Sequence, residues 1–143
     1  MIPQRLGIAS FALLSLILQA SCTDMPSGPG GTARLTTTPP GLSFGVKEAG
    51  APDVIRIVTV TNEGSAASEP LDITIEGTGA ASFDLLEGTS TCIGLELARG
   101  ATCTVAVSFG GQAVGPQSAT LFIDAGQGQD RATVTLNGIL QAP

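Results

Sequence analysis

Beyond residue 34 the sequence is dominated by short segments in which apolar and polar residues alternate with period two. In EPLDITIEG, every second residue from Leu71 to Ile75 is apolar and the residues between them are polar. Such alternation is typical of a β-strand with one buried face. The segments CTVAVSF, SATLFIDA and RATVTLNGIL repeat the pattern. Their expected inward-facing residues are Cys103, Val105, Val107 and Phe109, then Ala119, Leu121 and Ile123, then Ala132, Val134 and Leu136. With turn residues between the segments, the sequence predicts an all-β domain of about seven short strands, packed as two antiparallel sheets face to face.

The core of such a domain has to rest on aliphatic side chains. Hydrophobic residues make up 43% of the chain but aromatic residues only 3%, and Trp, Tyr and His do not occur. Outside the first twenty residues, the aromatic side chains that a core could use are Phe44, Phe83, Phe109 and Phe122. Without a Trp to pack on a disulfide or a Tyr at the strand corner, the domain is not of the antibody type.

The first 21 residues have the pattern of an export signal. One Arg lies within the first five residues, and Leu6 to Leu18 form an uncharged apolar run of 13 residues. A run of this length matches the apolar part of a signal peptide, whereas a membrane-spanning helix needs about 20 residues. We therefore expect residues 1–21 to be a lipoprotein signal peptide and the protein to be exported.

Two processing sites are compatible with the end of this leader. The sequence Gln19-Ala20-Ser21-Cys22 resembles the bacterial lipobox, whose cysteine is acylated and becomes the first residue, although Gln19 stands where the motif usually has Leu. Ala20 also fits the small-residue site of ordinary signal peptidase. Acylation of Cys22 is favoured, because it removes a free thiol and accounts for the Gly/Pro/Ser-rich tether over residues 22–33. By resemblance to lipoprotein sorting signals, Thr23 in place of Asp favours the outer membrane.

Cys92 and Cys103 are the two remaining cysteines, and they lie close together in TCIGLELARGATCTVAVSF. In an oxidising compartment such a pair is expected to form a disulfide. The alternative is a metal pair, but two thiolates at this spacing with no His in the chain make a poor zinc site. We expect a local clamp in front of the CTVAVSF strand.

The charges of the chain argue against several functions. Its formal net charge is −6, and six basic residues among twelve acidic ones are few for binding a phosphate backbone. Without His or Tyr, and with the rear cysteines paired, the usual pairs of base and nucleophile cannot be assembled. We therefore expect no nucleic-acid binding, no catalytic residues, no cofactor and no metal site.

Asp124 and Asp130 bracket the segment DAGQGQD, which invites the question of a calcium loop. Calcium takes six to eight oxygen ligands, and two carboxylates with two Gln side chains fall short of that set. The segment is therefore expected to be a polar hairpin turn.

Taken in order, five segments resemble the abnormal-spindle/hydin-like Ig-like domains, and in particular the choice-of-anchor D modules of exported bacterial proteins. These segments are LSFGVKEAG, VTVTNEGSA, the cysteine pair with GATCTVAVSF, GPQSATLFIDA and ATVTLNGIL, and they span Leu35 to about Leu140. The resemblance implies an Ig-like β-sandwich over residues 34–143, with its paired cysteines placed as in bacterial members. For function it implies a non-catalytic scaffolding or interaction module.

The expected function follows from these parts. We expect an outer-membrane lipoprotein, anchored to the membrane through lipid on Cys22 and facing the periplasm or the cell surface. Its Ig-like domain would bind a protein partner, for example through an exposed sheet edge. The alternative is a secreted protein without lipid that binds a soluble or carbohydrate ligand through its loops.

Overall fold

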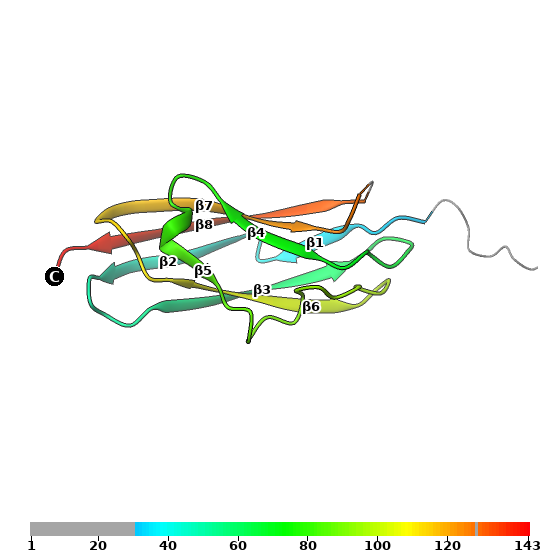
Figure 1. Cartoon of the computed structure of the whole chain (residues 1–143), viewed down its shortest axis with the longest axis horizontal. Helices are drawn as coiled ribbons and strands as arrows, with labels where there is room; N and C mark the ends of the chain where they lie inside the picture. Colours follow the sequence, from blue (N-terminus) through cyan, green and yellow to red (C-terminus); the bar gives the residue numbers. More distant parts are fainter. Residues whose placement is uncertain (1–30, 128) are drawn as a thin grey trace, which may run out of the picture. The chain divides into compact units, whose positions relative to one another are not determined.

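The computed structural model describes residues 31–127 and 129–143, and within them the compact unit Thr32–Pro143 is a β-sandwich (Figure 1). Eight strands form two four-stranded sheets, and the short 3-10 helix η2 directly precedes strand β5. The elements are β1 (Leu35–Thr38), β2 (Gly41–Glu48), β3 (Val54–Asn62), β4 (Asp72–Glu76), η2 (Ala80–Ser82), β5 (Phe83–Leu85), β6 (Thr102–Phe109), β7 (Gly115–Asp124) and β8 (Arg131–Gln141).

The strand order is β1-β3-β6-β5 in one sheet and β2-β8-β7-β4 in the other. Neighbouring strands are antiparallel except β2 and β8, which run parallel. The all-β sandwich expected from the sequence is thus confirmed, with eight strands instead of about seven. The additional strand arises because Pro39 and Pro40, which have no backbone N–H, end β1, and the chain then enters the other sheet as β2.

The alternation read from the sequence sets which side chains form the core. Along β8 the burial alternates at every residue, with the even-numbered positions buried or nearly so. The inward-facing residues expected in β6, β7 and β8 are all buried. Because the sheets face each other, these residues form one continuous aliphatic core.

Three aromatic rings fill one part of this core. Phe44, Phe83 and Phe109 come from β2, β5 and β6, and their ring centroids lie 5.1–5.8 Å apart in tilted pairs. Gly138 of β8 faces this cluster, and a Cβ atom there would lie 2.7 Å from the ring of Phe109. Glycine at this position therefore leaves the space that the ring occupies.

Phe122 does not belong to the core, contrary to its expected use there. It lies between the inward positions Leu121 and Ile123 of β7 and faces outward, because successive side chains of a strand point to opposite faces. The guanidinium carbon of Arg131 lies 5.2 Å from the centre of its ring, a cation–π arrangement on the outer face of the sheet.

Candidate functional site

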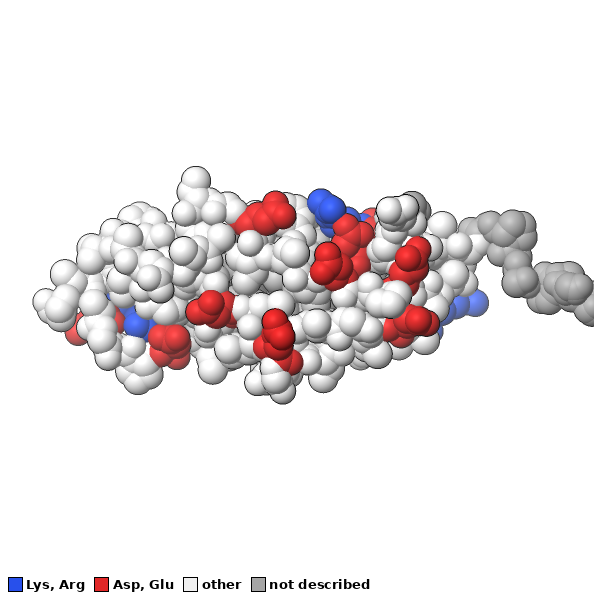
Figure 2. All heavy atoms as spheres, in the orientation of Figure 1, with Lys and Arg blue, Asp and Glu red and all other residues white. Residues whose placement is uncertain are grey.

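The outermost strands lie on two sides of the sandwich. One side carries β1 and β2, which follow each other in the chain, and the other carries β4 and β5. Figure 2 shows the face that carries β4 and β5, where acidic side chains are spread over the surface and basic ones lie only toward its margins. Each side is a candidate binding surface, because an outer strand exposes unpaired backbone groups to which another chain can bind.

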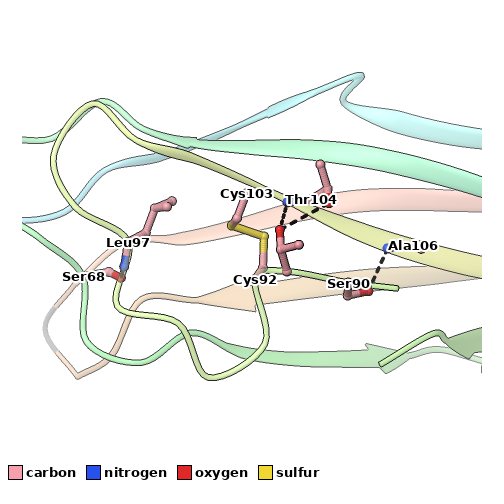
Figure 3. Close-up of a disulfide and its surroundings, with 8 residues drawn as sticks. Ser68, Ser90, Cys92, Leu97, Cys103, Thr104 and Ala106 are labelled. Atoms are coloured by element: carbon pink, nitrogen blue, oxygen red, sulfur yellow. Dashed lines mark hydrogen bonds between the residues drawn. A yellow bond between two sulfur atoms is a disulfide. The ribbon is translucent and has the colours of Figure 1, made fainter. Parts of the chain in front are cut away.

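The expected disulfide between Cys92 and Cys103 is confirmed and lies on the β4–β5 side (Figure 3). The two Cα atoms are 5.1 Å apart, and both residues are buried in the core. Cys103 belongs to β6, and Cys92 to the segment between β5 and β6. The bond therefore clamps this connecting segment onto the strand that follows it. Cys22, the expected site of lipid, and the leader 1–21 lie outside the described residues.

The segment around Cys92 covers the edge of β6 beyond the short strand β5. The amide of Thr91 donates a hydrogen bond to the carbonyl oxygen of Thr104, and the Thr91 hydroxyl oxygen accepts one from the Thr104 amide. The Ser90 hydroxyl oxygen accepts a bond from the Ala106 amide (Figure 3). These contacts leave β6 with partners on both sides.

Beyond the disulfide the same segment reaches the other sheet. The Leu71 amide donates to the carbonyl of Leu95, and the Gly94 amide donates to the carbonyl of Leu71. The Leu97 amide donates to the hydroxyl of Ser68 (Figure 3). Residues 94–97 thus pair with the chain that leads into β4 and close this end of the β4–β5 side.

Asn62 holds together three loops at the same end. Its side-chain amide donates to the carbonyls of Ala66 and Leu97, and its side-chain oxygen accepts from the amides of Arg34 and Gly64. The side chain is fully buried, and each of its polar atoms has two partners. Asn62 is not among the functional residues predicted from the sequence. Its position just before the turn residues Glu63 and Gly64 was the available signal.

The turn of DAGQGQD also binds the start of the domain. The side-chain oxygens of Gln129 and Asp130 accept hydrogen bonds from the amides of Ala33 and Leu35. Ala33, expected in the tether, is therefore part of the folded unit. Among residues 31–127 and 129–143, no group of three or more His, Cys, Asp or Glu side chains is arranged to hold a metal ion.

Asp124, the other acidic residue of this turn, is paired with Arg131 across β7 and β8. Both Nε and Nη2 of Arg131 donate to Oδ2 of Asp124, the shorter bond being 2.7 Å long. These bonds, together with one from the Gly126 amide, hold the pKa of Asp124 below its ordinary value. The same pair raises the pKa of Arg131.

The edge strand β2 carries three features that oppose pairing with another chain. Gly45 has a φ of 73°, and the register with β8 shifts between Ser43 and Val46. Arg56 reaches over from β3, and its Nε donates to the carbonyl of Ser43. Lys47 points inward, with its side chain 5% exposed and its Nζ 3.8 Å from a carboxylate oxygen of Asp53. A bulge and an inward-pointing charge are known ways of blocking an edge strand.

The edge of β4 has none of these features. Leu71 directs its N–H and C=O away from β7, and backbone direction alternates along a strand, so Ile73 and Ile75 direct theirs the same way. Where the structure describes the chain, no backbone or side-chain group pairs with these outward amides and carbonyls. The free stretch lies between the segment 94–97, which occupies Leu71, and the turn at Gly77.

The other two edges offer less to a partner. β1 has four residues and ends at two prolines, and β5 has three residues. Short edge strands are poor templates for pairing. Of the four outer strands, β4 is thus the one with a regular, unblocked edge.

Over the described ranges, no helix is long and apolar enough to cross a membrane.

No family model and no curated protein matches the chain. Among solved structures, PapD-like domain 7 of human CEP192 is similar with a TM-score of 0.54 and 12% identity, covering 91% of this chain and 99% of that domain. The VesB protease of Vibrio cholerae is similar with a TM-score of 0.50 and 21% identity, covering 73% of this chain and 31% of the protease. The secreted serine protease VesC from the same organism has a TM-score of 0.50 and 19% identity, and the match covers 80% of this chain and 24% of the protease. The chain thus spans less than a third of either protease. At these identities the likeness concerns the fold, and the fold of this chain is an Ig-like β-sandwich of the kind seen in a PapD-like domain.

Proposed function

We propose that this protein is a non-catalytic binding module of the bacterial envelope that adds a strand of a protein partner to the edge of β4. The observation that carries the proposal is the contrast between the edges. β2 is blocked by a bulge, an inward lysine and an arginine contact, whereas the outward amides and carbonyls of Ile73 and Ile75 are free. Main-chain hydrogen bonds to such an edge are a common mode of peptide binding.

The sequence of the first 33 residues supports a place at the membrane. Lipid on Cys22 would anchor the protein, and the tether that follows would hold the domain away from the bilayer. The resemblance to the choice-of-anchor D modules of exported bacterial proteins supports the same assignment. The mass of the mature protein tests the anchor: a diacylated N-terminal Cys22 is expected, and an unmodified N-terminal Ser21 would establish the secreted, unlipidated alternative.

The edge is tested by two matched variants at Ile75, which is half-buried in β4. Ile75→Ala removes the side chain and keeps the backbone N–H, whereas Ile75→Pro removes both. Proline is tolerated in an edge strand where its missing N–H would have faced solvent, so both variants are expected to fold. Circular dichroism checks that they do.

The measurement is capture of partners by the immobilised mature protein from a solubilised envelope fraction of the native host, with identification by mass spectrometry. We expect one protein to be retained by the wild type and by Ile75→Ala, and to be lost with Ile75→Pro. Equal capture by both variants would show that the β4 edge is not the binding surface.

A further inference from the structure

The stretch of chain between Arg56 and Arg99, which includes β4 and β5, contains no basic residue. One of its acidic residues, Glu63, pairs with Arg34 beside β1. The other six are Glu69, Asp72, Glu76, Asp84, Glu87 and Glu96, which are half of the twelve acidic residues of the chain. The negative charge visible in Figure 2 is therefore concentrated by the sequence on the side where the edge is open.

Asp72 and Glu76 stand at the two ends of β4 and point outward beside the free edge. Both are exposed, and the inward positions between them are taken by Ile73 and Ile75. The three ion pairs found in the described parts of the chain include neither Asp72 nor Glu76. The edge that can accept a strand is thus flanked by two carboxylates outside these ion pairs, four residues apart on one face.

Arg131, a cation on the same outer face, is already bound to Asp124. Asp72 lies directly opposite Asp124 in the pairing of β4 with β7, and Asp124 lies opposite Arg131 in the pairing of β7 with β8. Arg131 donates two hydrogen bonds to Asp124. Like charges directly opposite each other on neighbouring strands are unfavourable. A cation on the free side of Asp72 would therefore reduce the repulsion between Asp72 and Asp124.

We propose that the β4 edge takes an extended basic segment of a protein partner, with Lys or Arg at two positions four residues apart. This proposal rests on the proposed function and names the chemistry of the added strand. Side chains directly opposite on neighbouring strands lie about 4.5–5.5 Å apart, so basic residues of the added strand would meet Asp72 and Glu76 on the outer face. The free stretch limits the paired part to about five residues, between the segment 94–97 and the turn at Gly77.

The acidic residues on the β4–β5 side also favour a basic partner during its approach, before any contact is made. Charges of one sign gathered on one side of a protein speed the approach of an opposite charge, and salt weakens this effect. An acidic segment would be repelled by the same side. The expected partner is therefore basic and extended, and its binding is expected to depend on salt.

The test uses synthetic peptides with the mature protein. An alternating lysine–valine peptide is titrated against the protein and compared with a glutamate–valine peptide of equal length, with affinity measured by fluorescence anisotropy. Amide hydrogen exchange is followed at Ile73 and Ile75. We expect the lysine peptide to bind, to protect both amides, and to bind more weakly as the salt concentration rises from about 50 to about 300 mM.

Charge variants give the matched comparison. The double variant Asp72→Asn with Glu76→Gln is expected to weaken binding of the lysine peptide by roughly fivefold. The control is Glu48→Gln with Glu63→Gln, which removes the same charge away from the β4 edge and is expected to change the affinity less than about twofold. All four residues are exposed, so both double variants are expected to fold.

The outcomes separate this inference from the proposed function. If the envelope partner is captured through β4 but the glutamate peptide binds as well as the lysine peptide, the basic partner is wrong and edge binding stands. If the lysine peptide binds Ile75→Pro as well as the wild type, it binds elsewhere and the inference is overturned. Equal loss of affinity in the two double variants would likewise reduce the effect to overall charge and overturn it.

Discussion

Each side of the sandwich has outer strands with a backbone edge, but the edge of β2 is blocked and the edge of β4 is free. On the β1–β2 side, the edge is blocked by Lys47 pointing inward and by Arg56 on the carbonyl of Ser43. On the β4–β5 side, a disulfide-clamped segment covers β6 and leaves the edge of β4 free at Ile73 and Ile75. Blocking an edge prevents association with other chains, so a free edge at the opposite end of the same sheet indicates a binding surface.

The sides are also held in different ways. The side-chain oxygens of Asn62 and Asp130 accept hydrogen bonds from backbone amides at the start of β1, whereas a covalent bond fixes the segment beside β4. Asn62 belongs to both arrangements, because its side-chain amide also donates a hydrogen bond to the carbonyl of Leu97 in the segment 94–97. Asn62 is therefore the joint between the two sides. Substitutions can be made at this joint or on one side alone.

The largest effect is expected from Asn62→Ala, which breaks the joint. Four backbone groups lose their partner: the buried carbonyl of Leu97 and three part-buried groups, among them the amide of Arg34. An unsatisfied buried group costs about 1–3 kcal/mol, and water entering the space would offset part of the sum. We predict a loss of about 3–4 kcal/mol in the free energy of unfolding by urea. Thr61→Ala, next to it on the outward face of β3, is the control, and a similar loss there would show that the effect is not specific to the buried amide.

The next largest effect is expected from replacing Cys92 and Cys103 together by Ala. Their separation of 11 residues closes a short loop, for which chain entropy predicts a loss of about 3 kcal/mol on removal. The loss should be confined to one side: amide exchange should speed up at Leu71 and Leu95, while the pairs between β1 and β3 keep their protection. Unchanged exchange at Leu71 would mean that the disulfide does not hold segment 94–97 against β4.

The local sequence pattern predicted most of the strands, but it did not predict the side-chain hydrogen bonds that hold the loops between them together. Ala132, Val134 and Leu136 could be assigned to the core because one buried face imposes period two on β8. The network of Asn62 could not be predicted, since its partners lie as far away in sequence as Leu97 and become neighbours only in the folded chain. The disulfide was predictable because its partners are few.

The bulge in β2 shows the other limit of the pattern. Continuing the alternation from Leu42 and Phe44 would place Val46 inside, yet Val46 is 59% exposed and Lys47 is buried. The register shift between Ser43 and Val46 reverses the two faces of the strand beyond Phe44. Likewise, the sequence displays the acidic stretch plainly, but only the strand order reveals that it surrounds the free edge of β4.

A smaller change in stability, with a larger change in association, is expected from Lys47→Met. Methionine has a similar volume and removes a buried charge whose nearest carboxylate oxygen, on Asp53, is 3.8 Å away. Replacing a buried charge by an apolar side chain is often neutral or stabilising, here by about 1 kcal/mol. We predict an unchanged or higher Tm together with concentration-dependent self-association in analytical ultracentrifugation, because β2 loses its block. Glu48→Gln, the exposed neighbour, should stay monomeric, and a monomeric Lys47→Met would show that Lys47 does not guard this edge.

The smallest effect is expected from Asp124→Asn, and it should depend on pH. Hydrogen bonds from Arg131 hold the pKa of Asp124 below its ordinary value of about 3.9, so the carboxylate stabilises the folded state above that pH. This contribution is lost as the pH falls through the lowered pKa, because the folded protein then takes up the proton that the unfolded chain already carries. The pair is partly exposed, so the Tm at pH 7 should fall by only about 1–2 °C, and the difference between the proteins should shrink as the pH falls below the ordinary pKa of an aspartate. In the variant at pH 7, Arg131 is no longer held by Asp124 and can turn toward Asp72 and Glu76. This should weaken binding of the lysine–valine peptide to the β4 edge. An unchanged affinity together with the expected loss of Tm would show that Arg131 does not compete for this edge.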